Sequence, residues 1–155
     1  MSISTFNQSG NSQNVFCASG KGQMPIPVPS AYPTSSPTSG VAITLLPSQS
    51  GTLFLLAGAG AAITLPTPTS AGTGCWFKFQ MTTVYGTSSW VITSTGNVYG
   101  SLINNAAGTL GGIVKSAANS ATFSTGGVIG DQMTCTCDGA KWSITGYGGN
   151  TASFA

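Results

Sequence analysis

Hydrophobic and polar residues alternate in short stretches from Val41 onward, and clusters of Gly, Ser, Pro and Asn separate these stretches. Alternation with a period of two residues is typical of β-strands, and no stretch shows the period of an amphipathic helix. The pattern predicts strands at residues 41–46, 52–56, 62–65, 75–84, 89–94, 97–103, 112–115, 120–124, 132–137 and 141–145. So many short strands indicate an all-β fold, a single antiparallel β-sandwich or barrel, with a jelly-roll-like arrangement as one option.

Two stretches allow side chains to be assigned to faces. In residues 75–81, one face carries Cys75, Phe77, Phe79 and Met81, and the other carries Trp76, Lys78 and Gln80. Further along, Asp138-Gly139 is a signal for a two-residue type I′ turn. A hairpin closed by this turn places Cys137 opposite Ala140, Cys135 opposite Trp142 and Met133 opposite Ile144, all on one face.

Residues 1–40 differ from the rest of the chain. They are rich in Gln, Asn, Ser and Gly up to position 22, and Pro then occurs at positions 25, 27, 29, 33 and 37. Because Pro lacks an amide donor and favours extended geometry, we expect an extended Pro-rich N-terminal arm at 1–40 and a β-sandwich domain at 41–155. The arm is either a disordered tail or a segment that lies along a neighbouring subunit. Its apolar residues are the predicted partner contacts, namely Phe6, Phe16, Ile26, Val28 and Tyr32.

Residues 41–47 weakly resemble residues 61–66, since both stretches contain Ile-Thr-Leu and end in Pro. The similarity is too short to indicate a duplicated architecture. Pro is ordinary at the end of a strand, so we interpret both stretches as ordinary strand ends.

Charged side chains are nearly absent from this sequence. Only 4% of the 155 residues are charged, and the complete set is Lys21, Lys78, Lys115, Lys141, Asp131 and Asp138, with no His, Glu or Arg. General acid–base catalysis, hydrolytic metal sites and phosphate clamps depend on the missing residue types, so the composition argues against an enzyme. A net charge of +2 on scattered Lys residues also lacks the basic stripe of a nucleic-acid-binding protein.

The cysteines and the carboxylates have simpler interpretations than a metal site or a catalytic dyad. Cys135 and Cys137 share one face of a strand and cannot bond to each other, and the four cysteines lack zinc-knuckle spacing. We expect Cys75, Cys135 and Cys137 to be small core residues. Asp138 belongs to its turn, and Asp131 begins a strand, where it can hydrogen-bond the local backbone. The sequence therefore predicts no catalytic, metal-binding or cofactor-binding residue.

No secretory or membrane-spanning segment is predicted. The first 30 residues lack a basic start followed by an apolar stretch. The longest nearly apolar run, residues 53–65, has 13 residues, whereas a helix needs about 20 to cross a bilayer. We therefore expect a protein that is made in a cytoplasm and has no membrane partner.

The order of several short motifs resembles a known class of proteins. The motifs are Ile63-Thr64-Leu65-Pro66, Ala71-Gly72, Phe77 with Phe79, Trp90-Val91-Ile92-Thr93, Gly130-Asp131, Asp138-Gly139-Ala140-Lys141-Trp142 and Gly146. Over residues 51–148 they are similar to small β-rich virion structural proteins of tailed bacteriophages, of the capsid decoration or cement type. The resemblance implies a homotrimer on the capsid surface that binds the major capsid protein and stabilises capsomer junctions. It implies no catalytic residue.

We therefore expect a virion structural protein, made in the host cytoplasm, that clamps the outer capsid shell without catalysis. The alternative is a receptor- or glycan-binding module of a phage tail fibre or spike. This alternative depends on the aromatic residues, with Trp76 as the best candidate for a sugar platform, and on exposed loops such as residues 104–112. Either face of the strand that holds Trp76 can be the buried one.

Overall fold

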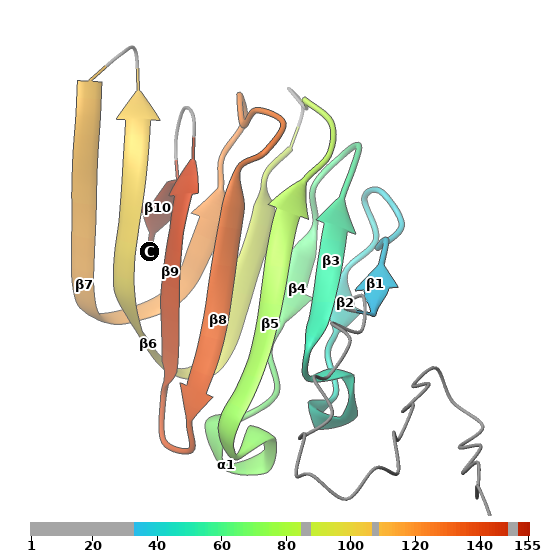
Figure 1. Cartoon of the computed structure of the whole chain (residues 1–155), viewed down its shortest axis with the longest axis vertical. Helices are drawn as coiled ribbons and strands as arrows, with labels where there is room; N and C mark the ends of the chain where they lie inside the picture. The colour runs from blue at the N-terminus through green and yellow to red at the C-terminus, as the bar shows by residue number, and fades with distance from the viewer. Residues whose placement is uncertain (1–32, 85–87, 107–108, 149–151) are drawn as a thin grey trace, which may run out of the picture. The chain divides into compact units, whose positions relative to one another are not determined.

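The computed structural model describes residues 33–84, 88–106, 109–148 and 152–155 (Figure 1). All five predicted partner contacts, Phe6, Phe16, Ile26, Val28 and Tyr32, lie outside the described residues, as does most of the predicted arm. The fold belongs to residues 33–155, which form a unit of their own.

Strands make up most of this unit. In chain order they are β1 Thr34–Ser35, β2 Ile43–Thr44, β3 Thr52–Leu56, β4 Ala62–Thr64, β5 Thr73–Met81, β6 Trp90–Ala106, β7 Thr109–Phe123, β8 Gln132–Asp138, β9 Trp142–Gly148 and β10 Ala152–Phe154. Short helical turns, η1 at Pro47–Gln49 and α1 at Pro68–Ala71, join some of them. Both turns begin at Pro, whose fixed φ suits the first position of a helix. The all-β prediction is confirmed.

The strands form one curled sheet in the order β1-β3-β5-β8-β9-β6-β4-β2. The curl lies in β6, because residues 98–104 of this strand pair with β9, whereas residues 91–93 pair with β4. β7 pairs antiparallel with both parts of β6 and also pairs with β10. As a result, β2 and β4 lie behind β3 and β5, and the sheet has the shape of a half-barrel (Figure 1).

The strand pairing is mixed, which corrects the prediction of an antiparallel sheet. β1, β3 and β5 run parallel to one another, as do β2, β4 and the first part of β6. β9 is also parallel to the second part of β6. From β1 to β6 the chain alternates between the two sides of the half-barrel, so it returns to each side in the same direction. A jelly roll, which consists of antiparallel strands, does not describe this arrangement.

Residues 41–47 and 61–66 are strand segments that end before Pro, as predicted, and they also lie side by side in the sheet, which their short similarity did not indicate. Ile43 pairs with Ile63, and Thr44 pairs with Thr64 in the next residue of the same ladder. The preceding turns also stack, since the backbone N–H of Gly40 donates to the carbonyl oxygen of Ala59 at 2.8 Å. The two segments are therefore equivalent parts of successive turns of the chain.

One hydrophobic core lies on the inner side of the curled sheet. The predicted faces of residues 75–81 are confirmed: Cys75, Phe77, Phe79 and Met81 are buried, and Trp76, Lys78 and Gln80 are half-buried on the outer side. The ring of Phe54 stacks on Phe79 with centroids 5.4 Å apart, and Phe77 lies 5.7 Å from Trp142. Aromatic packing thus connects β3, β5 and β9 across the core.

The β8–β9 hairpin has the predicted faces but a different register. Cys137 pairs with Trp142 and Cys135 pairs with Ile144, whereas we expected Cys137 opposite Ala140. The register is therefore shifted by two residues. Because side chains alternate with a period of two, this shift leaves every strand residue on its predicted face.

The cause of the shift is the Asp138 side chain. Its Oδ1 atom accepts hydrogen bonds from the backbone N–H groups of Ala140 and Lys141, at 2.8 and 2.6 Å. Asp138 is therefore the residue before the turn, and Gly139 and Ala140 are the loop residues. Gly139 has a φ of 92°, as the first loop position of a type II′ turn requires.

Strand boundaries differ from the prediction at four places. The strands predicted at 89–94 and 97–103 are one strand, β6, and those at 112–115 and 120–124 are one strand, β7. Register shifts between β6 and β7 accommodate the polar residues that suggested interruptions. β1 lies within the predicted arm and pairs with β3, at an edge position where neighbouring Pro residues are tolerated. β10 was not predicted.

Candidate functional site

The two carboxylates lie at opposite ends of β8. Asp131 directly precedes this strand and Asp138 ends it, so their Cα atoms are about 23 Å apart at the usual rise of a strand. A glycosidase dyad needs carboxyl groups within about 10 Å of each other. Asp131 and Asp138 of one molecule therefore cannot form such a dyad.

Asp131 has the structural role that the sequence predicts. Its side chain is 3% exposed, and its Oδ2 atom accepts a hydrogen bond from the backbone N–H of Val128 at 3.0 Å. Its carbonyl oxygen accepts a hydrogen bond from the N–H of Met81 at 2.8 Å. Asp131 therefore ties the segment before β8 to the end of β5, and the prediction of local backbone bonding is confirmed.

The three described cysteines are buried free thiols, as predicted. Burial raises the pKa of the Cys135 thiol. Burial also raises the pKa of the Cys137 thiol, against the opposing effect of the Gly139 N–H, which donates to its Sγ atom. Within the described ranges, no group of three or more His, Cys, Asp or Glu side chains is placed to hold a metal ion. Cys17 lies outside these ranges.

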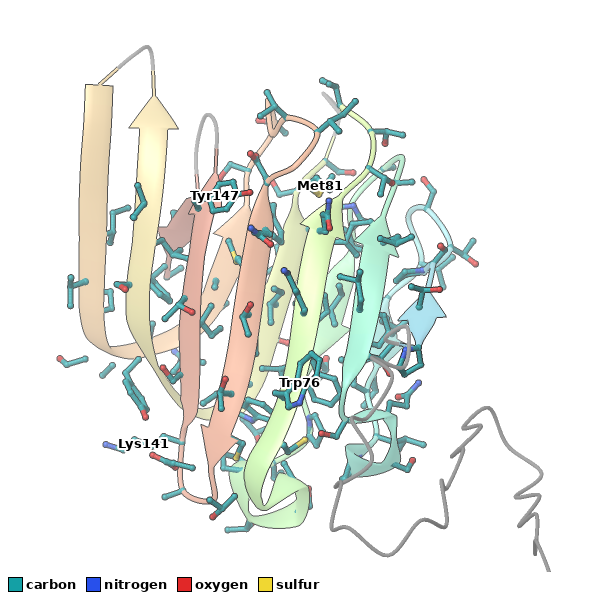
Figure 2. All side chains as sticks on the ribbon, viewed as in Figure 1. Trp76, Met81, Lys141 and Tyr147 are labelled. Carbon is teal, nitrogen blue, oxygen red and sulfur yellow. The ribbon has the colours of Figure 1, made fainter. Side chains whose placement is uncertain are left out.

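The aromatic residues described on the outer face of the sheet are widely spaced. Trp76 of β5 and Tyr99 of β6 lie in one row that passes through Thr136 and Ser143. Since β8 and β9 separate them, their Cα atoms are about 14 Å apart. Trp76 and Tyr147 also lie on distant parts of the sheet (Figure 2). These residues do not form the row of adjacent rings expected of a sugar platform.

The predicted exposed loop at residues 104–112 is mostly strand. β6 continues to Ala106 and β7 begins at Thr109, so these residues form the end of a long hairpin. The pairing continues to Ala106 and Thr109. The expectation of a long binding loop at this place was wrong, because residues 104–106 and 109–112 belong to paired strands.

Three exposed apolar side chains lie side by side on the outer face, where β9, β6 and β7 meet. Tyr147 pairs with Ile103, and Val114 pairs with Ser101 on the same face. Tyr147, Ile103 and Val114 are 48%, 54% and 79% exposed, although β-sheet pairing fixes the backbone of each of them. We call these three residues the apolar patch. Contiguous exposed apolar side chains of this kind are typical of surfaces that contact another protein.

A groove of about 680 Å³ lies beside the apolar patch. Its walls come from the second part of β6, the middle of β7, and the β8–β9 turn with the start of β9. Val114 belongs both to the groove and to the apolar patch. Three of the six charged residues of the chain line the groove: Lys115, Asp138 and Lys141. The other polar groups are the phenol of Tyr99 and the hydroxyls of Ser101, Ser116, Ser143 and Thr145.

Asp138 is the only carboxylate among the residues that line this groove. The backbone N–H groups of Ala140 and Lys141 hold its pKa below the usual value, and the Tyr99 hydroxyl and the Lys141 ammonium group act in the same direction. The Tyr99 hydroxyl donates to Oδ2 of Asp138 at 3.3 Å. The carboxylate therefore fixes both the turn and the phenol that lines the groove.

The lowered pKa predicts an acid-dependent contribution of Asp138 to stability. Because the folded-state pKa lies below the unfolded value of about 4, the ionised carboxylate stabilises the fold above that pH, and this contribution is lost as the pH falls through the folded-state pKa. We expect Asp138→Asn to lower the urea midpoint at pH 7 and to approach the wild-type midpoint below about pH 4. Tyr99→Phe, which removes one of the bonds, should give an intermediate pH dependence. Parallel curves for wild type and Asp138→Asn would contradict this account.

The sequence did not reveal the groove, because its charged residues come from separate parts of the chain. Lys115 lies on β7, Asp138 ends β8, and Lys141 lies in the turn. The parallel pairing of β6 with β9 places Tyr99 and Gly100 beside this turn. The sequence could have grouped only Asp138 and Lys141, because they lie three residues apart at one turn. Nothing in the sequence connects Lys115 with them.

Within the described residues, no helix has the length and the apolar character needed to cross a membrane. Inference about function depends on the sites themselves, since one fold supports many functions. No protein-family model and no curated protein sequence matches this chain.

Proposed function

We propose that this protein is a capsid decoration protein of a tailed bacteriophage, which binds the outer capsid shell at capsomer junctions without catalysis. The apolar patch carries the proposal, because its three side chains are exposed on paired strands and lie next to one another. Water contact with such a patch is unfavourable, and docking on another protein removes it. The scarcity of acid–base residue types supports a role in binding rather than in chemistry.

The proposal includes a homotrimer whose copies contact several capsid subunits at once. With several contacts, one subunit of the decoration protein rebinds before the others dissociate, so the trimer leaves the shell far more slowly than a single chain. Light scattering of the purified protein should give three times the chain mass of 15.5 kDa. A mass that stays at one chain at all concentrations would contradict the trimer and would leave lattice-dependent assembly as the only form of the proposal.

The test uses particles that lack the protein, to which purified protein is added back. Addition should raise the temperature at which the particles release DNA. The double variant Ile103→Ser with Val114→Ser should bind at least about tenfold more weakly, because losing the burial of two apolar side chains costs more than 1.4 kcal/mol. The control variant Val41→Ser with Leu46→Ser changes side chains that are 50% and 58% exposed but lie outside the apolar patch. We expect this control to bind within twofold of wild type.

Two results would oppose the proposal. If particles without the protein resist heat as well as complete particles do, the cementing role is wrong. Equal loss of binding in the patch variant and in the control would show that nonspecific hydrophobic association, rather than the apolar patch, causes attachment. Circular dichroism of both variants checks that they remain folded.

A further inference from the structure

The first part of β7 is an edge of the sheet. Residues 109–118 pair with β6 on one side. Among the described residues, no strand pairs with their other side, because β10 and Ala155 cover β7 only from Asn119 onward. Figure 1 shows β7 at the side of the sheet opposite to β1. We call residues 109–118 the β7 edge, and its outward backbone groups are available to an added strand.

The β7 edge lacks the features that usually protect an edge strand. The strands at the ends of the main strand order, β1 and β2, are only two residues long, with Pro33 directly before β1 and Pro47 soon after β2. The β7 edge is several times longer and contains no Pro, and Lys115 is its single charged residue. A long edge with so little protection is a template for strand addition by another segment.

The sequence of residues 24–30, which precede the described part of the chain, suits such an edge. It reads Met-Pro-Ile-Pro-Val-Pro-Ser, so Pro occupies every second position. Backbone groups of successive residues in a strand point to opposite sides. When this segment is extended, the N–H groups of Ile26, Val28 and Ser30 therefore point to one side, and the Pro nitrogens, which carry no hydrogen, point to the other. Such a segment can pair fully on one side only, as Pro-containing edge strands do.

We propose that residues 24–30 of one copy add as a strand to the β7 edge of a neighbouring copy. The same copy cannot supply this strand. Ser30 is four positions before Thr34 of β1, a span of at most about 14 Å, whereas the strand order places β7 six strand spacings from β1, about 29 Å along the sheet. A strand given to the next copy is a heterologous contact, which can close into a ring of three, whereas pairing of two β7 edges would give a dimer.

The apolar side chains of the added segment gain apolar neighbours. Ile26 and Val28 share one face of the segment, because side chains alternate along a strand. The β7 edge presents Val114, which is 79% exposed, on the outer face and Ile113, which packs against the core, on the inner face. Contact with either residue removes apolar surface from water. The number of copies rests on the proposed function, whereas the strand addition rests on the β7 edge and the sequence of the arm.

Light scattering of full-length variants tests the donor side of the segment. The double variant Ile26→Pro with Val28→Pro removes two N–H donors, so its trimer should dissociate at a concentration at least about tenfold higher than the wild-type trimer. The matched control, Pro25→Ala with Pro27→Ala, changes the opposite side of the segment. We expect the control to dissociate within about twofold of the wild-type concentration.

Amide hydrogen exchange tests the receiving edge. In the wild-type trimer, alternate amides of residues 112–118, those that point away from β6, should exchange slowly. In the double Pro variant these amides should exchange rapidly, whereas the amides that bond to β6 should remain protected. Circular dichroism of both variants checks that the β-sheet is intact.

Three results would overturn the proposal. Rapid exchange of the outward β7 amides in a wild-type trimer would show that another contact holds the copies together. A double Pro variant that remains trimeric to the same dilution as wild type would show that the N–H donors of the segment are not used. Slow exchange that begins only when the protein attaches to particles would assign the β7 edge to a segment of the capsid protein.

Adding the protein to particles separates this proposal from the proposed function. If the wild-type trimer has slowly exchanging outward β7 amides but does not attach to particles, the strand addition stands and the capsid role fails. If the protein raises the temperature of DNA release although its outward β7 amides exchange rapidly both before and after attachment, the capsid role stands and the strand addition fails.

Discussion

Replacing Gly100 with Ala is expected to destabilise the folded chain by about 4 kcal/mol, as the sum of backbone strain and overpacking. Gly100 has a φ of 148°, which side chains rarely adopt. A Cβ atom there would overlap the carbonyl oxygen of Ile144 and lie 2.7 Å from its carbonyl carbon. The position cannot relax easily, because Gly100 pairs with Ile144 and follows the register shift after Val98.

Urea unfolding of wild type and Gly100→Ala measures this effect. Domains are usually stable by about 5–15 kcal/mol, so the variant should have a much lower midpoint or fail to fold. Gly112→Ala on β7 is the matched control, because a Cβ at Gly112 has no atom within 4 Å. We expect this control to remain within about 0.5 kcal/mol of wild type. Similar midpoints for Gly100→Ala and Gly112→Ala would show that the close approach of β6 to β9 is not a constraint in solution.

The inner and outer faces of single strands could be predicted from the sequence, because they depend only on alternation along the strand. Phe77 and Phe79 were placed correctly on one face of their strand, although which face is buried was left open, and Cys135 and Cys137 kept their predicted face even though the hairpin register was wrong by two residues. Errors of two residues preserve the faces of a strand, so the prediction of the core tolerates them.

Contacts between distant strands could not be predicted in the same way. Parallel pairing of β3 with β5 and of β4 with β6 depends on a chain that alternates between two sides of the half-barrel, and no short motif specifies this path. The equivalent positions Ile43 and Ile63 were the one sign of it, and two short strands were too little to interpret. The groove depends on the pairing of β6 with β9, which no sequence motif indicated.

Trp142→Phe is expected to cost about 3 kcal/mol, and Trp90→Phe about 1 kcal/mol, although both indoles are fully buried. The difference lies in the indole N–H groups. The N–H of Trp142 donates to the carbonyl oxygen of Pro66 at 2.9 Å, in the segment that links β4 to β5. Phe at position 142 would leave this carbonyl without its donor and shrink the ring beside Phe77. The N–H of Trp90 has no hydrogen-bond partner among the described residues, so its removal relieves an unsatisfied donor and offsets part of the lost packing.

Urea unfolding of the two variants under identical conditions tests the comparison, because both remove the same atoms from the same core. The ring volume lost is equal, so the difference of about 2 kcal/mol between the variants reports the lost bond from Trp142 to Pro66 together with the removal of the unsatisfied N–H of Trp90. Native-state hydrogen exchange adds a local readout, since Trp142→Phe should speed exchange of the amides in α1 more than Trp90→Phe does. Equal costs for the two variants would mean either that the Trp142 bond contributes nothing net or that Trp90 finds a partner in solution. If Trp90→Phe lowers the free energy of unfolding more than Trp142→Phe does, the N–H of Trp90 contributes more to stability than the N–H of Trp142, which contradicts this account.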